Sequence, residues 1–269
     1  MSEKIKIETV ETDDFSMDYF RFGHGKETLV ILPGLSVQSV MGSADAVAGA
    51  YRVLTDNFTI YLFDRRKELP DHYSIHEMAQ DTVKAFRASG LDKIHLFGTS
   101  QGGMIAMDIA IHHPELVKKL VLGSTSSRLT EDRSCLFDKW IQLAEDGNAT
   151  ELYLSFGEAL YPKAVFDQVK DILSDMAAAV TNGELQRFII LAGGAKDFDI
   201  TNDLEKISCP VLVIGSNDDR VLGAEASLLI AEHLNSRPDF ELYMYDGYGH
   251  AAYDTAPDYK ERILRFLTA

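Results

Sequence analysis

The sequence predicts an α/β fold with a mostly parallel central sheet and helices on both faces. Strand-like apolar runs alternate with helical segments through the first half of the chain. Several of these runs are apolar without interruption, which is typical of strands buried on both faces. The alternation stops after Ser124 and resumes at Cys209, so a helical block is expected between two strands of one sheet.

The expected elements follow one another in a simple order. Residues 4–12 alternate polar and apolar side chains and predict an antiparallel hairpin with residues 17–23. Buried strands are then expected at 27–34, 58–64, 93–98 and 118–124, with helices at 44–54, 74–90 and 102–114 between them. Such an alternation indicates right-handed βαβ units, and ligands of these sheets bind beyond the carboxyl ends of the strands.

Only helical periodicity is present between residues 127 and 206. The strand pattern returns at 209–216 and 240–245, with helices expected at 224–234 and 257–267. We therefore predict a core domain made of residues 1–126 and 207–269, with an all-helical insertion at 127–206. Because the insertion interrupts one sheet, we do not expect it to be an independent domain.

Composition restricts the partners and the compartment. The 269-residue chain carries 42 acidic against 26 basic residues, a formal net charge of −16, which disfavours nucleic acids and anionic membranes. It contains no apolar stretch of membrane-spanning length, and its start has no signal-like apolar segment. Cys135 and Cys209 are too far apart in sequence to indicate a disulfide framework or a metal cluster. We expect a cytoplasmic protein with no metal or other cofactor and no nucleic-acid or membrane partner.

The strongest motif is "GTSQG", residues 98–102, at the exit of a buried strand and the start of a helix. Its G-x-S-x-G pattern is that of a nucleophile elbow. The flanking glycines permit a tight turn, the turn projects the hydroxyl of Ser100, and the following helix N-terminus favours developing negative charge. We predict that Ser100 is a nucleophile.

A serine hydroxyl needs a general base, which in turn needs an orienting acid. His250 follows the last expected strand and lies in a loop with Gly247 and Gly249, so it is the predicted base. The preceding strand is followed by two adjacent carboxylates, Asp218 and Asp219, either of which could be the acid.

The order serine, acid, histidine along this sheet resembles the α/β-hydrolase fold family. The resemblance covers nearly the whole chain and implies an acid followed by any residue and then two apolar ones. Asp219-Arg220-Val221-Leu222 fits that pattern, so Asp219 is preferred. The number of residues counted along the chain from Gly215 favours Asp218 instead, so Asp218 stays the alternative acid.

The same resemblance implies two backbone N–H donors for an oxyanion. One follows the nucleophile, here Gln101, and the other lies in the loop after the first buried strand, where Leu35 is the candidate. Many members carry His-Gly in that loop, whereas this chain has Pro33-Gly34. The helical block at 127–206 stands where the family inserts a cap over the site. Its aromatic residues are more readily explained as packing than as an acyl pocket, though both interpretations stay open.

These residues together predict a cofactor-free serine hydrolase that forms an acyl-enzyme. A small, partly apolar carboxylic ester is the expected substrate, while thioester, amide and C–C cleavage, perhydrolysis and acyl transfer stay open. A serine at the elbow argues against haloalkane dehalogenase and epoxide hydrolase chemistry, which in this family uses aspartate there. The alternative from another class is a non-catalytic receptor for a small ligand. The sequence leaves the oligomeric state open.

Overall fold

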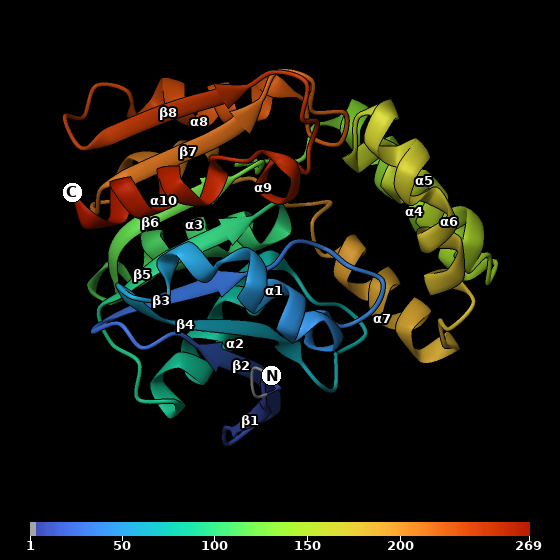
Figure 1. Cartoon of the computed structure of the whole chain (residues 1–269), viewed down its shortest axis with the longest axis horizontal. Helices are drawn as coiled ribbons and strands as arrows, with labels where there is room; N and C mark the ends of the chain where they lie inside the picture. The colour runs from blue at the N-terminus through green and yellow to red at the C-terminus, as the bar shows by residue number, and fades with distance from the viewer. Residues whose placement is uncertain (1–3) are drawn as a thin grey trace.

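An eight-stranded sheet runs through the molecule in the computed structural model, which describes residues 4–269 (Figure 1). Residues 1–3 belong to the N-terminal segment in which no signal-like apolar stretch is expected, and they lie outside the described range. The strand order is β1-β2-β4-β3-β5-β6-β7-β8. The strands are β1 Ile7–Glu11, β2 Ser16–Phe22, β3 Glu27–Leu32, β4 Phe58–Arg66, β5 Ile94–Thr99, β6 Val117–Gly123, β7 Val211–Ser216 and β8 Phe240–Tyr245.

Strand directions agree with the prediction from the sequence. β1 and β2 form the expected antiparallel hairpin, and β2 is also antiparallel to β4. All further neighbours, from β4 across to β8, are parallel. The carboxyl ends of β3, β5, β7 and β8 therefore lie at one edge of the sheet, where all the candidate site residues are found.

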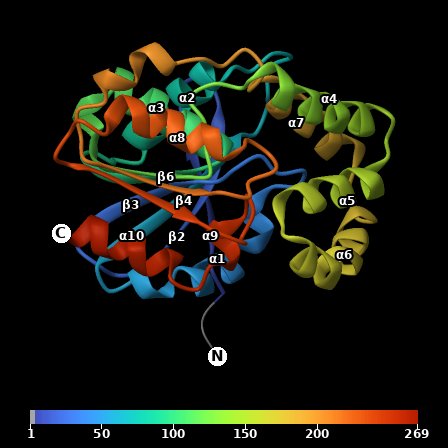
Figure 2. The same ribbon diagram turned by 90° about the horizontal axis from the view of Figure 1, so that it is seen from above.

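Helices cover both faces of the sheet (Figure 2). Residues of α2, α3 and α8 belong to the hydrophobic core on one face, and residues of α1, α9 and α10 belong to the core on the other. The helices of these two layers are α1 Ala44–Ala50, α2 Ile75–Ala88, α3 Gln101–His112, α8 Ala224–Leu234, α9 Ala252–Thr255 and α10 Tyr259–Thr268. Short 3₁₀ turns lie at Val40–Ser43, Arg52–Leu54, Pro114–Leu116 and Thr201–Lys206.

Two helices differ from the prediction. The single helix expected at 44–54 is divided, because the N–H of Tyr51 closes the last turn of α1 and the chain continues as a tighter 3₁₀ turn that buries Leu54. The last helix was expected from residue 257 and begins at Tyr259, after a short helix, α9, that was not predicted. Four residues of α9 are too few for a recognisable helical period.

The segment between β6 and β7 forms four helices on one side of the core, as Figures 1 and 2 both show. They are α4 Glu131–Glu145, α5 Ala149–Leu160, α6 Lys163–Ala177 and α7 Asn182–Gly193. We call them the helical block. Within residues 4–269, the structure contains no helix that is both long and apolar enough to cross a membrane.

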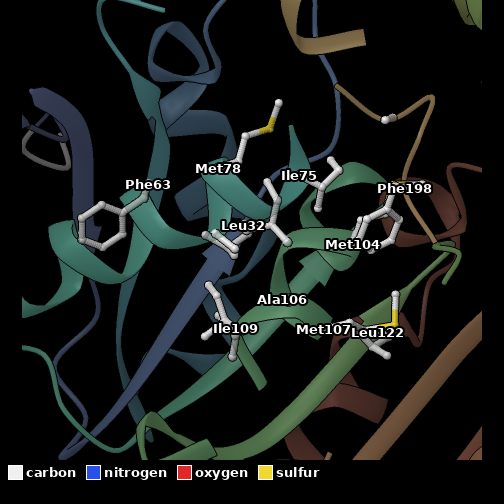
Figure 3. Packing of buried hydrophobic residues seen from close by; sticks show 14 of the residues in the cluster. Leu32, Phe63, Ile75, Met78, Met104, Ala106, Met107, Ile109, Leu122 and Phe198 are labelled. Carbon is white, nitrogen blue, oxygen red and sulfur yellow. The ribbon is translucent and has the colours of Figure 1, made fainter. Parts of the chain in front are cut away.

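Among the helices that cover the same face of the sheet, α3 is the most deeply buried. All its residues except His112 are buried, so apolar side chains face both the sheet and the neighbouring helices. Figure 3 shows Met104, Met107 and Ile109 of this helix in the same cluster of buried side chains as Leu32 and Leu122 of the sheet. Each such burial contributes about 1.5–3 kcal/mol, so the core holds firmly the helix that begins after Ser100.

Candidate active site

Ser100 lies between β5 and α3 in a conformation that non-glycine residues rarely adopt. Its φ is 50° and its ψ is −122°. The surroundings fix this backbone, since its N–H donates to the Gly123 carbonyl at 2.9 Å and its carbonyl accepts the Thr125 hydroxyl at 2.6 Å. Strained backbone of this kind persists only where neighbouring contacts enforce it, and it is concentrated at functional sites.

The glycines around Ser100 are required by close backbone contacts. A Cβ atom on Gly98 would lie 2.3 Å from the Gly102 carbonyl oxygen, and one on Gly102 would lie 2.1 Å from that of Leu32. A Cβ atom on Gly103 would lie 2.5 Å from the Thr125 side chain. Any side chain at these positions would therefore force β5, α3 and their neighbours apart, which explains the small residues of the motif.

His250 and Asp219 are paired at the edge of the sheet where Ser100 lies. Nδ1 of His250, after β8, is 2.8 Å from Oδ2 of Asp219, after β7. Both side chains are buried, with 1% and 9% of the residue surface exposed. An imidazole that donates its Nδ1 proton to a carboxylate keeps a lone pair on Nε2, and that is the tautomer a general base needs.

The carboxylate of Asp219 is held in its ionised form. Burial, the largest single effect, acts to raise its pKa, but the charge and hydrogen bond of His250 and two backbone amides act against it, and the net pKa is lowered. These amides, of Val221 and Leu222, donate to Oδ1 at 2.8 and 3.0 Å. One oxygen is thus fixed by backbone while the other faces the imidazole.

Asp218, the alternative acid, contacts a different set of groups. Its carboxylate accepts the Ser216 hydroxyl at 2.8 Å and the amides of Gly247 and Gly249 at 3.0 and 3.1 Å. The last two belong to the loop that carries His250. Asp218 therefore ties the loop after β8 to the end of β7, and of the two aspartates it is Asp219 that bonds to the imidazole.

The two predicted oxyanion donors come from neighbouring segments. Gln101 is the first residue of α3, and the first amides of a helix have no intrahelical acceptor. Leu35 belongs to the loop after β3, and a Cβ atom on the adjacent Gly34 would lie 3.1 Å from Cβ of Ser100. The loop therefore approaches the serine closely, as an oxyanion hole requires.

A buried arginine next to this loop was missed by sequence analysis. Nη2 of Arg65, at the end of β4, donates to the Pro33 carbonyl at 2.9 Å and to Oε1 of Gln101 at 3.3 Å. Burial lowers the pKa of its guanidinium to about 10, so it stays cationic at neutral pH. The amide group of Gln101 in turn donates to the Leu191 carbonyl of α7 at 2.6 Å. Arg65 thus connects both segments that carry the predicted oxyanion donors.

The neighbouring Asp64 joins the sheet to the helical block. Its carboxylate accepts hydrogen bonds from the Ser39 hydroxyl and from the guanidinium of Arg187 on α7. The signal that could have found this network is a pair of opposite charges, Asp64 and Arg65, directly after the apolar run of β4. Buried charges at a strand exit need partners, but the sequence does not identify them.

A cavity of about 580 Å³ separates the loop after β3 from the helical block. It begins at Ser36, next to Leu35, and extends between α5, α6 and α7. Just over half of its lining residues are apolar or aromatic, and the polar side chains in the lining are those of Ser36, Gln38, Ser39, Ser43 and Glu184. The apolar lining residues are Val37, Val40, Tyr153, Phe156, Leu160, Tyr161, Leu173 and Met176.

Comparison with known proteins identifies the family. The family model of the alpha/beta hydrolase fold matches residues 27–257. A relative from Agrobacterium fabrum, named "Putative carbamate hydrolase RutD", is 31% identical over 254 residues, which cover 91% of this chain and 96% of the relative. The chain therefore belongs to the α/β-hydrolase fold family, and it is an enzyme of the hydrolase class.

Solved structures agree on the fold. MGS-M2, an alpha/beta hydrolase from a Medee basin deep-sea metagenome library, superimposes with a TM-score of 0.86 at 21% identity over 97% of this chain and 98% of that one. The enol-lactonase from Burkholderia xenovorans gives a TM-score of 0.83 at 14% identity over 97% and 100%. At these identities the likeness concerns the fold alone.

Proposed function

We propose that this hydrolase cleaves a small acyl substrate, by preference a carboxylic ester, through a covalent acyl-enzyme on Ser100. The observation that carries the proposal is the strained turn of Ser100 at the sheet edge that also holds the His250–Asp219 pair. This is the arrangement that nucleophilic acyl transfer needs: a projecting hydroxyl, a base, and an acid that orients the base.

The reaction takes place in two halves. His250 accepts the proton of Ser100 while the serine oxygen attacks the substrate carbonyl, and the amides of Leu35 and Gln101 hold the resulting oxyanion. The leaving group departs with the proton from His250, which leaves the acyl group on the serine. Water activated by His250 then attacks the acyl-enzyme, and the acid product and free serine are released. Asp219 stabilises the imidazolium in both halves.

The cavity of 580 Å³ beside Ser36 is the proposed acyl pocket, with the helical block, which lies within the insertion at 127–206, as its cap. Its size lies within the ordinary range for small-molecule sites, and its apolar lining suits an acyl chain. Leu173 on α6 lines this cavity, whereas the preceding Ile172 is exposed.

The name of the relatives favours a second candidate, the hydrolysis of a carbamate. A carbamate also presents a carbonyl to the nucleophile, so the same residues would serve. Its nitrogen weakens the electrophile, so a rate on simple esters well above that on matched carbamates is expected if the ester proposal is correct.

Labelling with a fluorophosphonate probe tests the nucleophile directly. The native protein should be labelled once, at Ser100, and Ser100→Ala should fold normally and stay unlabelled. A native protein that resists the probe while binding a small ligand tightly would contradict the proposal and support the receptor alternative.

The pocket is tested with p-nitrophenyl esters of increasing acyl length and with carbamates of the same leaving group. Leu173→Phe should shorten the preferred acyl chain, because the larger ring fills the cavity. Ile172→Phe is the matched control on the same helix and should leave the preference unchanged. Equal effects of the two substitutions would rule out this cavity as the acyl pocket.

A further inference from the structure

Three side chains with metal-ligating groups meet where α2 packs against α3. His76 lies in the first turn of α2, and Asp108 and His112 lie one turn apart near the end of α3. Their ligating atoms are all within 4.8 Å of one another. Because residues four apart share one face of a helix, α3 presents a carboxylate and an imidazole together toward the imidazole of α2.

The two imidazoles converge on the same carboxylate. Nδ1 of His76 is 3.1 Å from each oxygen of Asp108, and Nδ1 of His112 is 3.2 Å from Oδ1. The rings are 5.0 Å apart and inclined at 73°. Metal–ligand bonds of about 2.0–2.2 Å place neighbouring ligand atoms about 3.0–3.6 Å apart. The observed nitrogen–oxygen separations match this spacing.

The charge of Asp108 gives a reason for a cation at this position. Only 2% of the residue is exposed, and a buried carboxylate is costly without a cationic partner. Among residues 4–269, the salt-bridge partners of Asp108 are His76 and His112. A divalent metal ion bound between the three side chains would give this carboxylate a cationic partner and would accept a lone pair from each imidazole.

We propose that His76, Asp108 and His112 bind a divalent transition-metal ion of the zinc type. Two imidazole nitrogens and one carboxylate oxygen are a common donor set for zinc, and a fourth position is left open. All three side chains line a cavity of about 720 Å³, which has room for water and is also lined by His72.

The metal has a structural role in this proposal. Asp108 is eight residues beyond Ser100, about 12 Å along the helix axis, so the ion does not touch the proposed reacting groups. It links α2 to α3 and so fixes the helix that follows the nucleophile. Nδ1 of His112 also lies 3.0 Å from the carbonyl oxygen of Asp108, so metal binding requires this half-exposed ring to give up that contact. No metal is expected from the sequence, because the three ligands come from two helices and form no continuous motif.

Zinc binding to tag-free protein tests the proposal, after treatment with a chelator and removal of that chelator by dialysis. We expect one Zn²⁺ per chain by calorimetry and by elemental analysis of the dialysed complex. Zinc at about a hundredfold above its Kd should raise the Tm by about 5 °C. Co²⁺ in place of zinc should give the visible absorption bands of a nitrogen- and oxygen-coordinated ion.

Variants localise the site. The double substitution His76→Ala with His112→Ala should abolish the stoichiometric binding and the Tm rise, and His112→Gln alone should weaken binding at least tenfold. His113→Ala, an adjacent histidine that contacts Gln80 instead, is the matched control and should bind zinc like the wild type. Cys135→Ser should also leave binding unchanged. No stoichiometric binding by the wild type, or undiminished binding by a folded double variant, would overturn the proposal.

Discussion

The carboxylate of Asp218 accepts the amide N–H of Gly249 at 3.1 Å, one residue before the imidazole that Asp219 contacts. Two adjacent aspartates thus act on one histidine in different ways. Asp219 bonds to its ring, and Asp218 bonds to the backbone of its loop. Substitutions at the two positions are therefore expected to have separable effects.

Asp219→Asn is expected to lower kcat by about 10⁴, because an amide stabilises the wrong imidazole tautomer and cannot support the imidazolium. Asp218→Asn should lower it less than about tenfold, because the amide oxygen still accepts a loop N–H. Steady-state kinetics on one p-nitrophenyl ester measures both. If Asp218→Asn were the more damaging change, the assignment of Asp219 as the acid would be wrong.

The lowered pKa of Asp219 predicts how its contribution to stability depends on pH. A carboxyl group whose pKa is lower in the folded than in the unfolded state stabilises the fold fully above its unfolded value, about 3.9. That contribution is lost as the pH falls through the lower, folded pKa.

Urea unfolding of the wild type and Asp219→Asn between pH 7 and pH 3 measures this effect. The difference in unfolding free energy should change as the pH falls below about 4, where the carboxyl group becomes protonated in the unfolded wild type. Asp138→Asn, an exposed carboxylate of the helical block, is the control. A difference that did not change between pH 4 and pH 3 would contradict the lowered pKa of Asp219.

Arg65 is predicted to be a positioning residue, since it bonds to the loop before Leu35 and to the side chain of Gln101. Arg65→Met should lower kcat by about 10- to 100-fold with a smaller change in KM, because slight misplacement of catalytic groups is costly. Arg66→Met is the matched control: it removes an ion pair with Asp81 and should lower the Tm while keeping kcat. Equal losses of kcat would indicate a merely structural role for Arg65.

Sequence and structure agree where a local pattern determines the outcome. The apolar runs predict the strands because burial on both faces leaves an unmistakable composition, and the glycines around Ser100 predict the tight turn. The Asp64–Arg187 pair and the contacts of Arg65 could not be predicted, because they join residues more than thirty positions apart. The choice between Asp218 and Asp219 depends on whether the loop after β7 is longer or shorter by one residue. The periodicity of apolar residues does not reveal such a difference.

The two cysteines are expected to differ sharply in reactivity. Cys135 is exposed on α4, whereas Cys209 is buried and its burial raises the pKa of its thiol to about 11. Because only the thiolate reacts, native protein should give one fast thiol per chain with a disulfide reagent at pH 8, and denatured protein should give two. Cys135→Ser should show almost none in the native state, and two fast native thiols would contradict the burial of Cys209.

The single tryptophan, Trp140, reports on the helical block. It is 1% exposed, and its Nε1–H donates to the Ser155 hydroxyl at 3.2 Å. Tryptophan fluorescence therefore follows the unfolding of the block, and far-UV circular dichroism follows the whole chain. Since residues of the block and of the sheet share one hydrophobic core, both signals should give the same denaturant midpoint.

Arg187→Met extends this test, because it removes the ion pair that joins α7 to the end of β4 and leaves Asp64 without that cation. The free energy of unfolding should fall by about 3 kcal/mol, and both signals should shift together. Lys163→Met, which breaks an exposed pair within α6, is the control and should change the free energy by less than about 0.5 kcal/mol. If fluorescence were lost at lower denaturant than circular dichroism, the block would unfold as a separate domain, contrary to its expected dependence on the sheet.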